Sequence, residues 1–367
     1  MSKILELNNI YNMNCLDGLK LIPNKMVNCC VTSPPYYGLR DYGIEKTLWP
    51  TVKYHPMAGI PYEIASHGWN GCLGLEPTIE MFIGHIVYIF REVKRVLKDD
   101  GTLWLNFGDS FVGSGKGAWK NKQRQKETYV PNPDSPQCKM KAPQSLKQKD
   151  LMGIPWRVAF ALQADGWYLR MDNIWSKTNC MPEAVKDRPT KSHEYMFLLS
   201  KNKKYYYDFE SIKEPCVNGD PESPRGSVGV LGNLNKGRRL KGNSKTFRGG
   251  GAYVNRQSFN NSEMVDRKSH GNKPNLLGTR NKRSVWSVST DKLGAAHFAT
   301  FPSKLIEPCI LAGCPKNGIV LDPFMGSGTT AAKALELQRN FLGFEINPGY
   351  IKLAETCRLN NVQIKMA

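Results

Sequence analysis

Short apolar runs alternate with segments of helical periodicity along the first hundred or so residues of the chain. Residues 28–32 form an apolar run that stops at two consecutive prolines, which predicts a buried strand ending in a loop. Residues 78–98 carry apolar side chains at helical spacing, with Thr78 as the expected N-cap. Residues 102–107 are again apolar and predict the next buried strand.

The same alternation returns in later parts of the chain. Strands that alternate with helices predict an α/β protein with a doubly wound, mostly parallel sheet covered on both faces. Further strands are expected at 168–175, 194–199, 319–321 and 341–345, and further helices at 155–164, 329–337 and 349–359.

Two segments depart from this pattern. Residues 111–150 are polar, basic and rich in Lys and Gln, which predicts a mobile loop. Residues 211–295 are rich in Gly and Asn with scattered short apolar runs, which predicts a small irregular insert. Residues 1–210 and 296–367 are then expected to form the two halves of one domain.

The excess positive charge is concentrated in those two segments. The chain of 367 residues has 51 Lys and Arg against 32 acidic residues, a net charge of +19. Nine basic residues face three acidic ones in 111–150, and sixteen face six in 211–295. Aromatic and amide side chains are interleaved with these cations, so a nucleic acid is favoured as partner over simple solvated loops.

Several protein classes are disfavoured by composition. No apolar run is long enough to span a membrane, and no secretory signal is seen at the start, so a cytoplasmic protein without membrane contact is expected. The ten cysteines include no C-x-x-C pair, and Phe197 stands where a zinc-protease helix needs its second histidine. Neither disulfides nor a metal site are therefore expected.

A glycine loop follows the apolar run at 319–321. Gly326 and Gly328 let the backbone approach a ligand closely, and the helix that begins beyond them favours an anionic group. Glu345 ends the next strand, near the offset from Asp322 at which an acidic residue binds ribose hydroxyls in nucleotide-binding α/β folds. The loop alone also satisfies the dinucleotide pattern, so an NAD-dependent dehydrogenase remains an alternative at this point.

The segment Ser33-Pro34-Pro35-Tyr36 follows the strand at 28–32. The prolines remove two N–H donors, so the Ser33 hydroxyl and two carbonyls remain as acceptors beside the flat ring of Tyr36. Such a corner suits a planar ring that carries an amino group. A rigid turn that packs Tyr36 into the core is the structural alternative, but the carboxyl end of a buried strand is where α/β sheets bind ligands.

Together these motifs resemble a known family. Thr-Ser-Pro-Pro-Tyr at 32–36, Asp-Pro-Phe-Met-Gly-Ser-Gly-Thr-Thr at 322–330 and Phe-Leu-Gly-Phe-Glu at 341–345 look like those of the amino-methylating DNA methyltransferases. The catalytic motif precedes the cofactor motif, as in the permuted β group. The resemblance covers about two-thirds of the chain, missing chiefly the two basic segments. It is carried by residues 12–21, 74–110, 151–208 and 297–359.

The resemblance implies a fold and a reaction. The fold would be a seven-stranded Rossmann-like methyltransferase sheet, permuted, with 211–295 as DNA-recognition insert. The enzyme would flip a base out of double-stranded DNA and transfer a methyl group in line from S-adenosyl-L-methionine to its exocyclic nitrogen. Tyr36 would stack on the base, and Ser33 with the Pro34 carbonyl would accept from its amino group, in a corner completed by Pro35. The expected further substrate-binding residues are Thr32, Arg188 and His193; an ordinary strand-edge histidine is an equal alternative for the last.

The resemblance also implies cofactor contacts. Glu345 would bind the ribose hydroxyls, Lys304 would be the cation for the methionine carboxylate, and Asn14 would lie near the adenine, where the family usually has an acidic residue. The full set expected to bind the cofactor is Asn14, Cys15, Phe301, Lys304, Asp322, Phe324, Gly326, Ser327, Gly328, Thr329 and Glu345.

Several functional questions remain open at this level. Ser33 before Pro-Pro-Tyr is typical of members that methylate N4 of cytosine, with N6 of adenine as the alternative. An RNA or protein-amide methyltransferase, a dehydrogenase and a non-catalytic DNA-binding module are the competing classes. A homodimer and a cognate restriction endonuclease as partners are compatible with the sequence, which predicts neither.

Overall fold

The computed structural model describes residues 5–39, 43–113, 146–215, 279–290, 301–360 and 362. The chain divides into two compact units, one formed by Met1–Ile212 with Arg283–Ala367 and the other by Lys213–Lys282. In the second unit the described residues form a two-stranded antiparallel ladder of β10 (Glu214–Pro215) and β11 (Thr279–Arg280). The expected basic loop at 111–150 and insert at 211–295 lie largely outside the described residues.

A single large sheet organises the first unit. Its strand order is β1-β14-β13-β2-β7-β9-β8-β12. All neighbours pair in parallel except that β9 runs antiparallel to both β7 and β8. The strands are β1 (Asn9–Asn12), β2 (Val27–Thr32), β7 (Leu97–Phe107), β8 (Tyr168–Lys177), β9 (His193–Ser200), β12 (Val285–Val288), β13 (Ile319–Asp322) and β14 (Asn340–Glu345).

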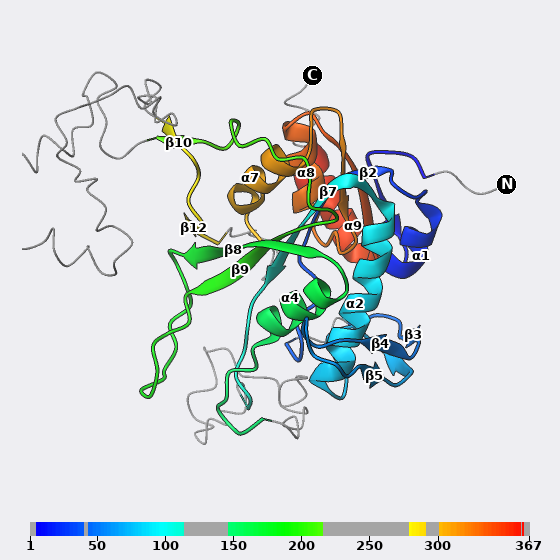
Figure 1. Cartoon of the computed structure of the whole chain (residues 1–367). Helices are drawn as coiled ribbons and strands as arrows, with labels where there is room; N and C mark the ends of the chain where they lie inside the picture. Colours follow the sequence, from blue (N-terminus) through cyan, green and yellow to red (C-terminus); the bar gives the residue numbers. More distant parts are fainter. Residues whose placement is uncertain are drawn as a thin grey trace, which may run out of the picture. The chain divides into compact units, whose positions relative to one another are not determined.

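Helices cover both faces of this sheet, so the predicted doubly wound α/β fold is confirmed (Figure 1). The family resemblance implies seven strands and the sheet has eight, because the short β12 pairs in parallel with the edge strand β8. β12 lies within the range expected for the insert but belongs to the first unit. The helices are α1 (Cys15–Leu21), α2 (Ile79–Val96), α4 (Ile154–Ala164), α7 (Ser303–Gly313), α8 (Thr329–Glu336), α9 (Pro348–Ala354) and the π-helix η3 (Glu355–Leu359).

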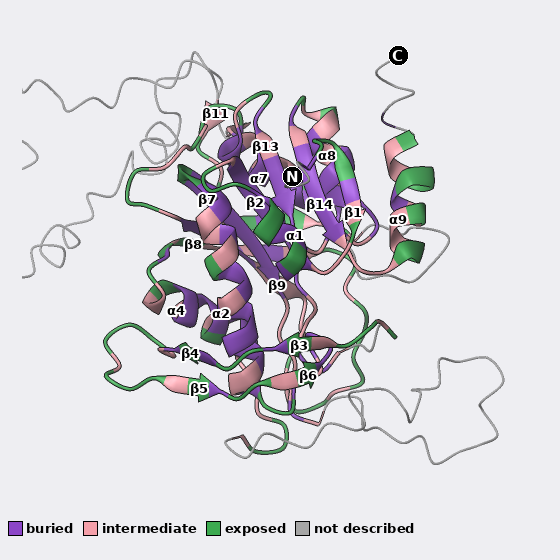
Figure 2. Ribbon diagram, turned by 90° about the vertical axis from the view of Figure 1, so that its right-hand side faces the viewer, coloured by how far each residue is buried: buried purple, intermediate pink, exposed green. Residues whose placement is uncertain are grey.

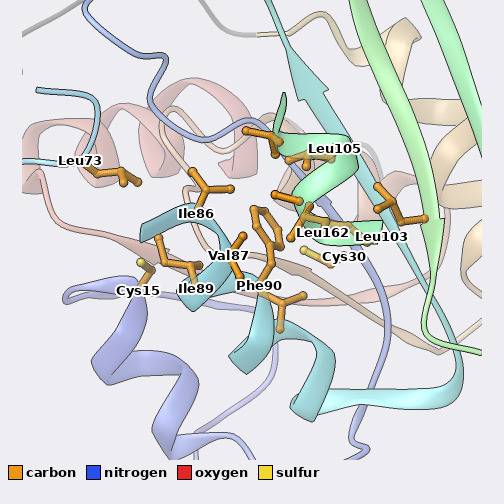
Figure 3. Packing of buried hydrophobic residues seen from close by; sticks show 14 of the residues in the cluster. Cys15, Cys30, Leu73, Ile86, Val87, Ile89, Phe90, Leu103, Leu105 and Leu162 are labelled. Atoms are coloured by element: carbon orange, nitrogen blue, oxygen red, sulfur yellow. The ribbon is translucent and has the colours of Figure 1, made fainter. Parts of the chain in front are cut away.

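Alternating residues of the central strands pack into two separate cores. Cys30 of β2 points to the core shared with α2 and α4, whereas its neighbours Cys29 and Val31 pack against α7 on the other face. Figure 3 shows the first of these cores, where side chains of α2 meet those of β7 and α4. The strands are therefore apolar throughout, and Figure 2 shows most of the central sheet as buried.

The helix predicted at 78–98 is α2, and its N-cap is confirmed: the Thr78 hydroxyl accepts a hydrogen bond from Met81 N at 3.1 Å. Between β2 and α2 the chain makes four short strands in two antiparallel pairs, which no sequence pattern indicates. They are β3 (Thr47–Trp49), β4 (Val52–Tyr54), β5 (Ile64–Ser66) and β6 (Trp69–Gly71). In the described part of the chain no helix is both long and apolar enough for a membrane span.

The strand order places a topological switch point between β13 and β2. The chain continues from β13 to β14 on one side and from β2 to β7 on the other, with α8 and α2 on opposite faces. Loops that follow β13 and β2 therefore diverge at this point, and in α/β sheets the resulting crevice is where ligands bind.

Candidate active site

One cavity lies at the carboxyl ends of four adjacent parallel strands. Its wall includes residues 13–15 after β1, Ser33 and Pro35 after β2, residues 323–327 after β13, and residues 345–347 at the end of β14. Residues from both predicted motifs thus line the same space, although the motifs are separated by almost the whole chain.

The corner at Ser33 has its acceptors partly exposed and its tyrosine anchored. Ser33 and Pro35 line the cavity, whereas Pro34 is buried and Tyr36 packs behind the wall, stacked on Phe107 with ring centroids 5.5 Å apart. The Tyr36 hydroxyl donates to Glu194 Oε2 at 2.7 Å. Burial, followed by the nearby Glu194 carboxylate, raises the pKa of Tyr36 well above its usual value.

The glycine loop is held by the carboxylate predicted to bind ribose. Glu345 Oε2 accepts from Gly326 N, and its Oε1 accepts from Asn347 N, both at 2.8 Å. Burial raises the pKa of the Glu345 carboxyl, and the two backbone N–H groups oppose that shift. Each oxygen retains a lone pair, so the carboxylate can also accept from ligand hydroxyls in the cavity.

The loop itself fits a ligand with an anionic end. Gly328 is the N-cap of α8 with φ of +79°, and its missing side chain lets the loop pack on Ala354, 2.6 Å from where a Cβ would lie. The buried Ser327 hydroxyl has no hydrogen-bond partner among the described residues, yet Ser327 lines the cavity. An orphaned hydroxyl beside a helix N-terminus suits the amino-acid end of the predicted cofactor. Phe324 and Thr329 line the same wall.

The side chains of Asp322 and Thr32, both predicted to contact a ligand, are bonded to each other beneath the cavity wall. Both side chains are buried, and neither residue lines the cavity. Asp322 accepts from the Thr32 hydroxyl at 2.6 Å, from the Thr330 hydroxyl at 2.6 Å and from Phe324 N at 3.0 Å. Thr32 therefore has no free hydroxyl hydrogen for a substrate. Burial raises the pKa of Asp322 to about 6, against the opposing effect of its three donors.

Asn14 lines the cavity but its side chain is already engaged. Its Oδ1 accepts from Leu16 N at 2.9 Å as the N-cap of α1, and its Nδ2 donates to the Thr47 hydroxyl at 2.7 Å. Cys15 lines the cavity beside it, and burial raises the pKa of its thiol to about 12. A neutral thiol of this kind contributes packing surface and no nucleophile.

The two predicted cofactor-binding residues near the start of α7 lie in different environments. Phe301 is buried and lines the cavity. Lys304, in the first turn of α7, is exposed and is not part of the cavity wall. The structure therefore does not bring the predicted carboxylate-binding cation to the site.

Arg188 lies in the connection between β8 and β9, and His193 is the first residue of β9. Arg188 Nη1 donates to Glu183 Oε2 at 2.6 Å, and the guanidinium lies over the Phe111 ring, 3.8 Å from its centroid. His193 packs edge-on against Tyr195, and burial, followed by Lys191, lowers its pKa. Neither residue lines the cavity.

Several cavity residues escape sequence reasoning. Trp49 and Leu73 come from the segment of short strands between β2 and α2. Their position in the cavity wall depends on tertiary packing, which the hydrophobic pattern of the sequence does not indicate. Asn347 and Tyr350 could have been predicted, because Asn-Pro-Gly-Tyr at 347–350 begins two residues after Glu345 and indicates a helix start at the same edge of the sheet.

Comparisons with known proteins agree with this geometry. The model of the DNA methylase family N6_N4_Mtase matches residues 27–356. The type II methyltransferase M.Cfr9I of Citrobacter freundii is 38% identical over 96% of this chain and 89% of its own length. M.SmaI of Serratia marcescens is 40% identical over 92% of this chain and 86% of its own.

Among solved structures, the PvuII DNA methyltransferase (cytosine-N4-specific) shares the fold. Its TM-score is 0.52 at 15% sequence identity, over 98% of this chain and 92% of that chain. The family match spans most of the chain and excludes the dehydrogenase alternative. The chain therefore belongs to the family of amino-methylating DNA methylases, as a DNA methyltransferase of the type II class whose cofactor is S-adenosyl-L-methionine.

Proposed function

We propose that this DNA methyltransferase methylates the N4 nitrogen of cytosine in duplex DNA, after flipping the cytosine into the cavity between the Ser33 corner and the glycine loop. The observation that carries the proposal is that Ser33 and Pro35 line the same cavity as Ser327 and Glu345. Catalysis then rests on positioning and electrostatics, with no covalent intermediate on the enzyme.

The residues of the cavity have separate tasks in this reaction. S-adenosyl-L-methionine, when bound, supplies an electrophilic methyl group on a sulfonium centre. Glu345 accepts hydrogen bonds from ribose hydroxyls, while the Ser327 hydroxyl and the backbone N–H groups of the loop hold the amino-acid end. Ser33 and the Pro34 carbonyl accept from the exocyclic amine, which turns the nitrogen lone pair away from the ring and toward the methyl group.

Cytosine is preferred over adenine because of the residue before the two prolines. Ser33 offers a short neutral hydroxyl, the choice typical of N4-cytosine members, where N6-adenine members usually carry Asp or Asn. Flipping costs a few kcal/mol of stacking, which contacts of the base with the cavity wall would have to offset. Methylation of adenine N6 is the second candidate, because its amino group presents the same two hydrogens to the corner.

The product nucleoside tests the proposal. Plasmid DNA is incubated with the purified chain and S-adenosyl-L-methionine, digested to nucleosides and separated by mass spectrometry. N4-methyldeoxycytidine is the expected product. Detection of N6-methyldeoxyadenosine instead would show that adenine, and not cytosine, is the methylated base. Unmethylated RNA of equal length serves as competitor, and preferential labelling of the RNA would overturn the DNA assignment.

Substitutions in the corner separate catalysis from cofactor binding. Ser33→Ala removes the hydroxyl acceptor and is expected to lower the single-turnover rate by about a hundredfold. The affinity for S-adenosylhomocysteine, measured by calorimetry, should remain close to that of the unaltered chain. Equal losses of rate and affinity would assign Ser33 a structural role.

The basic segment 211–295 is proposed to supply target recognition. Its sixteen Lys and Arg suit phosphate contacts, and its interleaved amides suit base edges in the major groove. Replacing this segment with that of a relative of different sequence specificity is expected to change the methylated sequence and leave the type of methylated base unchanged.

A further inference from the structure

The Tyr36 hydroxyl lies among two side-chain acceptors and two donors, the latter being the Ser33 hydroxyl and the Gly108 backbone N–H. Glu194 Oε2 is 2.7 Å away and Asn106 Oδ1 is 3.1 Å away. The Asn106 amide is oriented by its Nδ2, which donates to Tyr195 O at 2.9 Å, so its oxygen faces the phenol. Tyr36 has a single hydroxyl hydrogen, and the shorter, charged acceptor is Glu194.

This arrangement determines the direction of the next hydrogen bond. Ser33 Oγ is 3.4 Å from the Tyr36 hydroxyl. Because the Tyr36 hydrogen is directed to Glu194, Tyr36 can only accept from Ser33, and Ser33 must donate. The Ser33 oxygen then keeps only lone pairs for the cavity that it lines, which is the state needed to accept from an amine.

Glu194 is itself held by the sheet. Its Oε1 accepts from Lys177 Nζ in an ion pair in which both side chains are largely buried, 14% and 23% exposed. Lys177 and Glu194 lie on the paired strands β8 and β9, and the ammonium also lies over the Trp175 ring, 4.6 Å from its centroid. With one carboxylate oxygen occupied by Lys177, the other is directed to Tyr36.

We propose that Glu194 is a positioning residue for methyl transfer, which directs the hydrogen bonds Ser33 to Tyr36 to Glu194 so that Ser33 faces the substrate amine as an acceptor. The proposal rests on the proposed function only in that the substrate presents an exocyclic amine. Glu194 need not touch substrate or cofactor, and Lys177 contributes by deciding which carboxylate oxygen faces Tyr36.

The key variant is Glu194→Gln, which keeps the shape of the side chain. Lys177 has hydrogens to donate, so it claims the amide oxygen, and the amide NH2 then faces Tyr36 as a donor. This NH2 competes with Ser33 for the Tyr36 oxygen, and the Ser33 hydrogen is released toward the cavity. The single-turnover rate on DNA is expected to fall about tenfold or more, with unchanged affinity for S-adenosylhomocysteine.

Removing Lys177 should reverse that loss. In the double variant Lys177→Met with Glu194→Gln, the amide oxygen is free to turn toward Tyr36, and the rate is expected to recover about threefold or more over Glu194→Gln alone. A purely structural ion pair predicts the opposite, because removing the second partner adds damage. A wild-type rate in Glu194→Gln, or a double variant slower than that single variant, would overturn the proposal.

The control is an ion pair of the same kind away from the cavity. Lys333 and Glu336 on α8 are 2.6 Å apart, with 12% and 36% of the side chains exposed. Glu336→Gln is expected to leave the rate within about twofold of wild type. Product analysis of the wild-type chain tests the proposed function separately, because an adenine product would change the base and leave the comparison of Glu194 variants intact.

Discussion

The hydroxyl of Thr32 donates to the carboxylate of Asp322 at 2.6 Å, across 290 residues of sequence. Thr32 ends β2 and precedes the Ser33 corner, and Asp322 ends β13 and precedes the glycine loop. These two strands flank the switch point of the sheet. This buried hydrogen bond ties the Ser33 corner to the glycine loop at the end of the paired strands β2 and β13.

Loss of this bond should destabilise the protein without changing its shape. Thr32→Val is isosteric but leaves the buried carboxylate with one donor fewer, and we expect the free energy of unfolding in urea to fall by about 1–3 kcal/mol. Thr356→Val is the control, because that exposed hydroxyl has only local contacts, to the Lys352 carbonyl at 2.8 Å and to the Cys357 sulfur at 3.6 Å. Equal effects of the two substitutions would contradict a special role for Thr32.

The raised pKa of Asp322 makes stability depend on pH. Its folded-state pKa of about 6 exceeds the ordinary value of 3.8, so the folded state binds this proton more tightly than the unfolded chain. The contribution of Asp322 to stability is therefore largest below about pH 4, is lost between about pH 4 and 6, and is constant above. It amounts to about 3 kcal/mol.

Asp322→Asn removes this titration. The difference in unfolding free energy between wild type and Asp322→Asn, measured in urea at intervals from about pH 4 to 7, should decline across that window. A difference that is independent of pH would show that the carboxyl titrates normally in the folded state. Other acidic groups affect both proteins equally and cancel in the comparison.

Elements with strong local signals were predictable from the sequence. The apolar runs of β2 and β13 and the capped periodicity of α2 each report their own burial. The roles of Thr32 and Asp322 were not predictable, because they depend on which strands become neighbours. The motif resemblance assigned both residues to ligands, whereas the fold uses them on each other.

The segment between β2 and α2, in contrast, could not be predicted from local sequence signals. Its strands have three residues each, and β3 combines the buried Trp49 with Leu48, which is 80% exposed. Such short mixed runs carry no recognisable period. The contact of Glu194 with Tyr36 could not be predicted from the sequence either, because it depends on the register of β9 against β7 and β8.

The two glycines of the cofactor loop should respond differently to alanine. A Cβ on Gly328 would lie 2.6 Å from that of Ala354 at a φ of +79°, so Gly328→Ala is expected to cost about 3 kcal/mol of stability. Gly326 has a φ of +54° but open space, with its nearest neighbour 3.9 Å away, so Gly326→Ala should cost about 1 kcal/mol.

The loss of cofactor affinity should be larger for Gly326→Ala than for Gly328→Ala, the reverse of the order expected for stability. Gly326 lines the cavity and Gly328 does not, so the methyl group of Gly326→Ala enters space that the cofactor would use. Calorimetry with S-adenosylhomocysteine is expected to show the larger relative loss of affinity for Gly326→Ala, and urea unfolding the larger loss of stability for Gly328→Ala. Parallel losses in both assays would mean that the loop acts as one rigid unit.

A buried Glu–His pair lies behind the Ser33 corner. Glu76 Oε1 pairs with His85 Nδ1 at 2.9 Å, and Glu76 Oε2 accepts from Gly74 N at 2.8 Å, with both side chains fully buried. Gly74 passes so close to the corner that a Cβ on it would lie 2.9 Å from the Tyr36 carbonyl oxygen. His85 also stacks on Trp49 of the cavity wall, with centroids 4.5 Å apart.

Glu76→Gln should therefore affect both stability and the cavity. The amide has one oxygen where the carboxylate has two, so its contacts with Gly74 N and His85 Nδ1 cannot both be kept as they are, and we expect a loss of about 3 kcal/mol in urea. Glu63→Gln is the matched control, since Glu63 faces His55 at 3.7 Å with both side chains about half exposed and should change stability by less than about 0.5 kcal/mol. Cofactor affinity, measured by calorimetry with S-adenosylhomocysteine, should fall in Glu76→Gln alone. Similar results for the two variants would mean that the buried pair does not hold the corner.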